Sequence, residues 1–192
     1  SQNNIYVTNL KIYDCYQGIN FYNVINSTIN NVRIENCKYG DYFSAGIYLL
    51  NCDSISITQS HFQSNNAGIA SYYSNDNIVY NNYCYNDSYG IAFLNGRNNY
   101  VYNNRILSDT IGLISIDCSA NTIYSNNISF VNITGILVES CTRTLIDSNS
   151  IYGCSIGVEF SLNKNNIIKN NIIMNNQNNG IFLSSETGSI FI

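Results

Sequence analysis

One short motif recurs along most of this 192-residue chain, and its spacing limits the possible folds more than any other feature. A glycine is followed directly by Ile, Leu or Val, and the gaps between successive glycines are 28, 22, 22, 22, 23, 22 and 23 residues. The glycines are Gly18, Gly46, Gly68, Gly90, Gly112, Gly135, Gly157 and Gly180. A period in this range is the signature of a repeat protein. The chain is therefore expected to be a stack of similar units, with the glycine serving a tight corner or a positive φ.

Each unit contains three groups of apolar residues at strand spacing. Aliphatic residues alternate with other residues at a period of two, which is typical of strands, and no segment keeps a helical period over ten or more residues. Three short strands per coil cannot bury their own apolar face, but stacked coils bury like residues above like. The expected inward columns are Ile47, Ile69 and Ile91; Ile57, Val79, Val101, Ile123, Ile146 and Ile168; and Phe62, Cys84, Ile106, Ile128, Ile151 and Ile173. A polar column, whose stacked side chains can hydrogen-bond along the stack, comprises Asn77, Asn99, Asn121, Thr144 and Asn166.

The run from Gly90 to Asn104, like that from Gly157 to Asn171, resembles the repeats of right-handed parallel β-helices. Such repeats occur in pectin-lyase-like proteins, in the NosD family and in many surface or phage fibre proteins. The resemblance covers almost the whole chain and implies an all-β fold. The expected architecture is a single-stranded right-handed parallel β-helix, a solenoid of about eight coils of roughly 22 residues with three short strands per coil.

Residues 1–192 are expected to form a single β-helix domain with partial first and last coils. The unit that begins at Gly18 is six residues longer than the next, which predicts a corner insertion at about residues 38–44. The last unit stops at Ile190, Phe191 and Ile192, which predicts an apolar end that continues in further sequence or docks against another subunit.

Composition restricts the partners. The chain has 8 Lys and Arg against 12 Asp and Glu, a net charge of −4, which argues against nucleic acid and against a polybasic membrane surface. No apolar run reaches 18 residues, so no membrane span is expected. The start lacks Met and a charged-then-apolar leader, so it reads as a mature or excised chain. Four sequons favour a secreted or cell-surface glycoprotein, although an Asn-rich chain also produces some by chance: Asn26, Asn86, Asn127 and Asn132.

The seven cysteines allow two interpretations. They are either small buried thiols at tight corners, or one pair forms a disulfide, for which Cys15 and Cys37 on adjacent coils are the preferred candidates. No Cys-x-x-Cys or Cys/His spacing occurs, so a zinc site is not expected, and no metal or other cofactor is predicted. The NosD resemblance suggests a role in copper handling, for which one histidine, His61, and one methionine, Met174, are a poor ligand set.

Tyrosines form a candidate binding column. Tyr80, Tyr102 and Tyr124 share one repeat position and are expected to face outward above one another. Stacked rings stabilise the sheet itself, and they also offer a flat platform to sugar rings.

Acidic residues decide whether the chain is an enzyme. Asp117, Glu139 and Glu159 are the best acid group, because they fall on consecutive coils near one strand position. Paired carboxylates can act as acid and base or nucleophile in glycan cleavage. The Asp-Asp, Gly-His-Gly and Arg-x-Lys patterns of related enzymes are missing, so scattered solvated acids are the simpler interpretation.

The sequence thus favours a non-enzymatic extracellular β-helix, a structural or adhesive module of a surface fibre, filament or sheath that self-associates or contacts neighbouring surface proteins. The alternative is a carbohydrate-active enzyme or carbohydrate-binding β-helix that contacts glycans.

Overall fold

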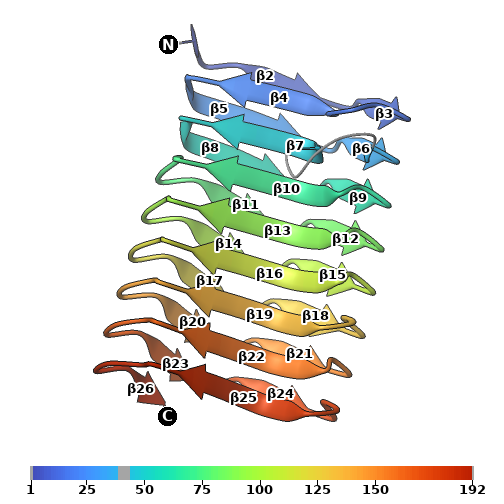
Figure 1. The fold of residues 1–192 in the computed structure, drawn as a ribbon. Coiled ribbons are helices and arrows are strands. Elements are labelled where there is room, and N and C mark those ends of the chain that lie inside the picture. Colours follow the sequence, from blue (N-terminus) through green and yellow to red (C-terminus); the bar gives the residue numbers. More distant parts are fainter. Residues whose placement is uncertain (1, 39–43, 192) are drawn as a thin grey trace.

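The computed structural model describes residues 2–38 and 44–191, and all of its regular secondary structure is β-strand. The chain winds into a column of stacked coils whose three faces are three parallel sheets (Figure 1). The all-β parallel β-helix expected from the repeat is confirmed. The greater part of the predicted insertion, residues 39–43, lies outside the described residues.

Sheet A has the strand order β1-β5-β8-β11-β14-β17-β20-β23-β26, with β2 also paired to β5. Its strands are β1 (Gln2–Asn3), β2 (Tyr6–Thr8), β5 (Val24–Asn30), β8 (Asp53–Thr58), β11 (Ile78–Tyr80), β14 (Tyr100–Tyr102), β17 (Thr122–Tyr124), β20 (Leu145–Asp147), β23 (Ile167–Lys169) and β26 (Ile190–Phe191).

Sheet B follows sheet A after one corner. Its strands are β3 (Lys11–Tyr13), β6 (Arg33–Glu35), β9 (His61–Gln63), β12 (Tyr83–Tyr85), β15 (Arg105–Leu107), β18 (Asn127–Ser129), β21 (Ser150–Tyr152) and β24 (Ile172–Met174).

Sheet C completes each coil. Its strands are β4 (Ile19–Tyr22), β7 (Ala45–Leu50), β10 (Ala67–Tyr72), β13 (Tyr89–Leu94), β16 (Ile111–Ile116), β19 (Thr134–Glu139), β22 (Ile156–Ser161) and β25 (Asn179–Ser184).

The register follows the repeat. Ile47 pairs with Ile69 and Ile69 with Ile91, and all three side chains are fully buried. The column continues through Leu113, Ile136 and Val158. Because the inward residues of this column are aliphatic in every one of these coils, the interior of the described coils forms one continuous apolar cluster.

The repeated glycines serve close packing rather than a special φ. The repeat glycines were expected to serve a tight corner or a positive φ, and the second alternative is wrong, because only Gly153 and Gly188 among the described glycines have positive φ. A Cβ at Gly90 would lie 2.6 Å from the backbone oxygen of Gly112 and 2.5 Å from Asp109 Oδ2. No side chain fits there, because the neighbouring coil and a corner carboxyl occupy the space.

The corners themselves use left-handed residues of other types. Asn81, Asn103 and Ser125, which each follow a sheet A strand, have φ of 55°, 53° and 53°. Asparagine tolerates this conformation better than most residues, which explains why asparagines collect at the corners.

Candidate functional site

The corner between sheets A and B carries a surface hollow lined mostly by polar side chains. Tyr80 ends β11 and Tyr83 begins β12, with only Asn81 and Asn82 between them. Two outward columns therefore run on either side of one corner, one on each sheet. We call the hollow surface along it the corner groove, lined by Asn9, Leu10, Lys11, Asn31, Val32, Arg33, Gln59, Ser60, His61, Asn81, Asn82, Tyr83, Asn103 and Arg105.

On the sheet A side, the structure brings the predicted tyrosines together in one stack. The ring centroids of Tyr80 and Tyr102 are 5.0 Å apart, those of Tyr102 and Tyr124 are 4.8 Å apart, and the ring planes differ by 10° and 14°. All three side chains are half-buried. Burial, followed by the neighbouring phenols of Tyr124 and Tyr80, raises the pKa of Tyr102. We call these three residues the tyrosine column; it ends at Asp147, whose Oδ2 lies 3.4 Å from Lys169 Nζ.

On the sheet B side, basic side chains form a second column. Lys11, Arg33, His61, Tyr83 and Arg105 are direct register partners on β3, β6, β9, β12 and β15. The Tyr83 ring lies between two of them, with its centroid 4.9 Å from that of His61 and 5.5 Å from Arg105 Cζ. Arg33 pairs with Glu35 on its own strand. We call the four basic residues of this set, Lys11, Arg33, His61 and Arg105, the cation column.

Arg33, His61, Tyr83 and Arg105 are spaced by 28, 22 and 22 residues, like the first repeat glycines, so their shared repeat position is visible in the sequence. The sequence did not show that they line a groove, because the shape of the surface depends on the corner residues between the two sheets. The periodic corner asparagines were the available signal.

The three candidate catalytic acids are not brought into direct register. Glu159 lies opposite Leu137, and Glu139 lies opposite Ser161 on one side and Ile116 on the other. Glu159 Oε2 accepts a hydrogen bond of 2.9 Å from the Thr134 hydroxyl, while Asp117 is an exposed corner residue. The register staggers these acids along sheet C, away from the corner groove.

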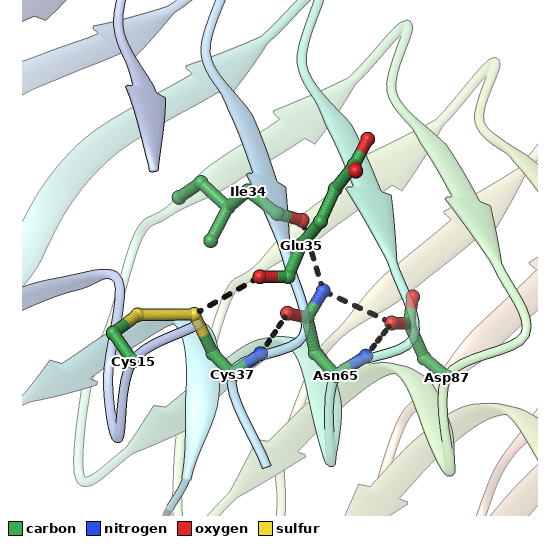
Figure 2. Close-up of a disulfide and its surroundings, with 6 residues drawn as sticks. All are labelled: Cys15, Ile34, Glu35, Cys37, Asn65 and Asp87. Carbon is green, nitrogen blue, oxygen red and sulfur yellow. Dashed lines mark hydrogen bonds between the residues drawn. A yellow bond between two sulfur atoms is a disulfide. The ribbon is translucent and has the colours of Figure 1, made fainter. Parts of the chain in front are cut away.

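The corner between sheets B and C carries the disulfide. The Cys15–Cys37 bond joins adjacent coils across a Cα–Cα distance of 4.6 Å. Figure 2 shows how a line of hydrogen bonds leads from it to the following coils. Cys37 N–H donates to Asn65 Oδ1 at 3.0 Å, and Asn65 N–H donates to Asp87 Oδ1 at 2.7 Å. The line ends where Asp87 N–H donates to Asp109 Oδ1 at 2.8 Å.

We call Asn65, Asp87 and Asp109 the acid ladder. Asp87 is 3% exposed and Asp109 is fully buried. Burial and then the nearby Asp109 raise the pKa of Asp87 well above its usual range, and burial raises the pKa of Asp109 to about 8. Sequence reasoning missed this pair, although the 22-residue spacing of Asn65, Asp87 and Asp109 was visible.

The remaining predicted sites are dispersed. The four sequon asparagines, Asn26, Asn86, Asn127 and Asn132, all have exposed side chains. Cys118 and Cys141 are adjacent buried thiols, and their mutual hydrogen bond lowers the pKa of Cys118 to about 7 and raises that of Cys141. At the last coil Ile190 is 51% exposed, whereas the Phe191 side chain and Ile192 lie outside the described residues.

Sheet C presents an apolar hollow of about 230 Å³ on its outer face. Its lining includes Ala70 and Ala92, which are register partners, and Tyr72 and Tyr89. This surface lies on a different sheet from the corner groove, so the two can be tested separately.

The stacked coils, three parallel sheets and outward polar columns define the chain as a parallel β-helix repeat protein. A family model described as periplasmic copper-binding protein (NosD) matches residues 2–190. The chain belongs to the NosD family. No curated protein matches the sequence.

Solved β-helix proteins share the fold at low identity. The Streptococcus pneumoniae surface protein and adhesin PfbA is 13% identical with a TM-score of 0.57, over 99% of this chain and 67% of that one. Tailspike protein 2 of bacteriophage CBA120 is 12% identical with a TM-score of 0.60, over 98% of this chain and 38% of the tailspike. The Dettilon tailspike protein is 16% identical with a TM-score of 0.58, over 88% of this chain and 43% of the tailspike. The chain thus spans less than half of either tailspike.

The described residues do not fit the copper site that the family's description implies. Copper binds best to clustered imidazole, thiolate or thioether ligands. His61 lies on β9 and Met174 on β24, separated in sheet B by β12, β15, β18 and β21. Within residues 2–38 and 44–191 no three His, Cys, Asp or Glu side chains lie close enough together to hold a metal ion.

The described part of the chain also contains no helix that could span a membrane.

Proposed function

We propose that this chain is a structural and adhesive module outside the cytoplasm, and that its rigid column holds a glycan chain along the corner groove. The observation that carries the proposal is the pair of outward columns flanking one corner, with stacked phenol rings on one side and cationic side chains on the other. Aromatic faces pack against the apolar faces of sugar rings, and Arg and Lys bind sugar carboxylates and hydroxyls through charge-assisted hydrogen bonds.

The regular spacing supports a linear ligand. The ring centroids of successive tyrosines in the column are 4.8–5.0 Å apart, because the tyrosines belong to consecutive coils. An extended polymer lying parallel to the column axis would contact Tyr80, Tyr102 and Tyr124 on three consecutive coils, with Arg105 on the coil of Tyr102. A rigid platform also loses little conformational entropy on binding, since its side chains are already ordered by stacking.

The location is part of the proposal. It is supported by membership of a family described as periplasmic, by the exposed sequons and by a disulfide, which persists in oxidising compartments. Self-association or contact with neighbouring surface proteins in a fibre, filament or sheath is also part of the proposal, with the exposed apolar side chains of Ile181, Leu183 and Ile190 as the contact surface. Sedimentation should then depend on concentration, and Leu183→Glu should abolish that dependence; a parent chain that stays monomeric at high concentration would contradict self-association.

The binding proposal is tested on a panel of neutral and acidic polysaccharides. Tyr102→Ala and Arg105→Gln should each weaken binding by about fivefold or more, as expected when a contact residue at an interface is truncated. Tyr22→Ala is the matched control, because Tyr22 is an exposed tyrosine on sheet C, and it should bind like the parent. Equal binding by all variants, or none by the parent, would refute the corner groove as a glycan site.

The same panel addresses catalysis. New reducing ends or unsaturated products that vanish in Glu139→Gln would favour the carbohydrate-active enzyme that uses Asp117, Glu139 and Glu159.

A further inference from the structure

The acid ladder contains two carboxyl oxygens that lack any partner. Asp87 Oδ2 and Asp109 Oδ2 are both buried and accept no hydrogen bond from the described residues. An unpaired buried polar atom costs free energy, and an unpaired buried charge costs more. Each oxygen therefore needs an explanation in terms of its protonation state.

An equivalent ladder of asparagines at the corner between sheets A and B shows which hydrogen bonds a buried corner side chain makes in this fold; we call it the asparagine ladder. It comprises Asn82, Asn104, Asn126, Asn149 and Asn171. Asn104 Oδ1 accepts from Asn82 N–H at 3.0 Å, and Asn104 Nδ2 donates to the Val79 carbonyl of the preceding coil at 2.9 Å. One side chain thus accepts from a backbone amide and donates to a backbone carbonyl.

The acid ladder repeats this arrangement at its first member. Asn65 Oδ1 accepts from Cys37 N–H, and Asn65 Nδ2 donates to the Ile34 carbonyl at 3.1 Å (Figure 2). Asp87 and Asp109 keep the accepting half, because each Oδ1 receives a backbone N–H from the preceding coil. Their Oδ2 atoms take the place of the amide nitrogen, which is a donor.

We propose that Asp87 and Asp109 keep their protons in the folded protein at neutral pH, each as a neutral substitute for asparagine, and that alkaline deprotonation loosens the coils they join. Protonated Oδ2–H donates as Nδ2–H does. By the register Ile34–Phe62–Cys84, the equivalent carbonyl acceptors are those of Phe62 for Asp87 and of Cys84 for Asp109.

The surroundings oppose ionisation. Asp87 and Asp109 face each other one coil apart, and the titratable group that faces both from β12 is the buried Cys84 thiol, whose own pKa is raised by burial and then by the two acids. No Lys, Arg or His of the described residues adds to either aspartate shift. Val131 occupies the equivalent position on the next coil, so the ladder ends there without a compensating donor.

The direction of the pH effect follows from the raised pKa. Below about pH 4 both carboxyls are protonated in the folded and unfolded chains. Between there and the folded pKa, about 8 for Asp109, the unfolded chain releases protons that the folded chain retains. Stability therefore falls as pH rises through this window, and the unfolding constant increases by up to about tenfold per pH unit for each retained proton.

The test compares urea unfolding of the parent, Asp87→Asn, Asp109→Asn and the double variant at pH 5, 7 and 9. The parent should lose stability across this range, while the double variant should lose most of that slope and be more stable than the parent at pH 9. Asp76→Asn is the control, since Asp76 is an exposed corner acid with φ of 55°, and it should keep the parent's slope. An unchanged slope in the double variant would overturn the proposal.

A second measurement needs no variant. The infrared spectrum of the folded parent at pH 7 should contain the carbonyl band of a protonated carboxylic acid, and this band should vanish as the pH is raised above the folded pKa. A parent spectrum at pH 7 with only carboxylate bands would refute the proposal even if the variants failed to fold.

Discussion

The middle of the column and its last coil carry the same apolar pattern but bury it to different extents. On β13, Ile91 is fully buried and Phe93 is 1% exposed. On β25, Ile181 and Leu183 occupy the same columns, yet they are 39% and 46% exposed. The difference is the number of neighbours, because β13 lies between β10 and β16 whereas β25 pairs with β22 alone in the described sheet. The core therefore belongs to the stack and not to any single coil.

The largest expected effect comes from a cavity in a middle coil. Phe93→Ala removes a ring that is enclosed on both sides and should lower the free energy of unfolding by about 3–5 kcal/mol. Leu183→Ala removes a half-exposed side chain from the same column and should cost about 1 kcal/mol or less. Denaturant unfolding of both variants measures the contrast. Equal losses would mean that stacking does not determine burial energy.

The disulfide should stabilise the first coils by the next largest amount. The Cys15–Cys37 bond closes a separation of 22 residues between adjacent coils, and such a bond typically contributes about 2–4 kcal/mol by restricting the unfolded chain. Adding a reductant should lower the thermal midpoint of the parent, while Cys15→Ser should start lower and ignore the reductant. A parent that is insensitive to the reductant would contradict a stabilising role at this end.

The asparagine ladder should also be more sensitive to substitution in the middle of the column than near the last coil, with smaller losses of stability. Asn104→Ala leaves Asn82 N–H buried without an acceptor and should cost about 1–3 kcal/mol. Asn171 is half-buried, accepts from Asn149 N–H at 2.8 Å and borders the last coil, so Asn171→Ala should cost less. Urea unfolding of the two variants side by side decides this, and a larger loss at Asn171 would reverse the expected order.

The smallest expected effect is a gain at a corner. Leu162 has φ of 58° and is 60% exposed, so a branched apolar residue occupies a left-handed corner without being buried. Leu162→Asn should raise the free energy of unfolding by about 1 kcal/mol, because asparagine tolerates this conformation better. The thermal midpoint reports the change. A lower midpoint would show that Leu162 makes a stabilising contact that outweighs its backbone strain.

The fold was largely predictable because a repeat fixes its own register. Once Ile47, Ile69 and Ile91 are aligned by the period, the parallel pairing follows without any long-range guess. The same alignment placed Tyr80 and Tyr102 in one column, which the structure shows as stacked rings.

The rest was hidden for physical reasons. An aspartate at a polar corner normally indicates exposure, so Asp87 gave no local sign that the next coil would bury it. The corner groove likewise depends on the angle between two sheets, which no single repeat position encodes. The repeat period therefore predicts which side chains of different coils are neighbours. Their protonation state depends on burial, which the period does not predict.

Amide hydrogen exchange along the asparagine ladder tests most directly whether each coil is held by its neighbours. At pH 5 we expect the slowest exchange at Asn82, Asn104 and Asn126, whose N–H groups donate to the Asn side chain of the next coil at 2.9–3.0 Å, and progressively faster exchange through β22 to β25. Uniform protection along the column, or the strongest protection in β25, would contradict it.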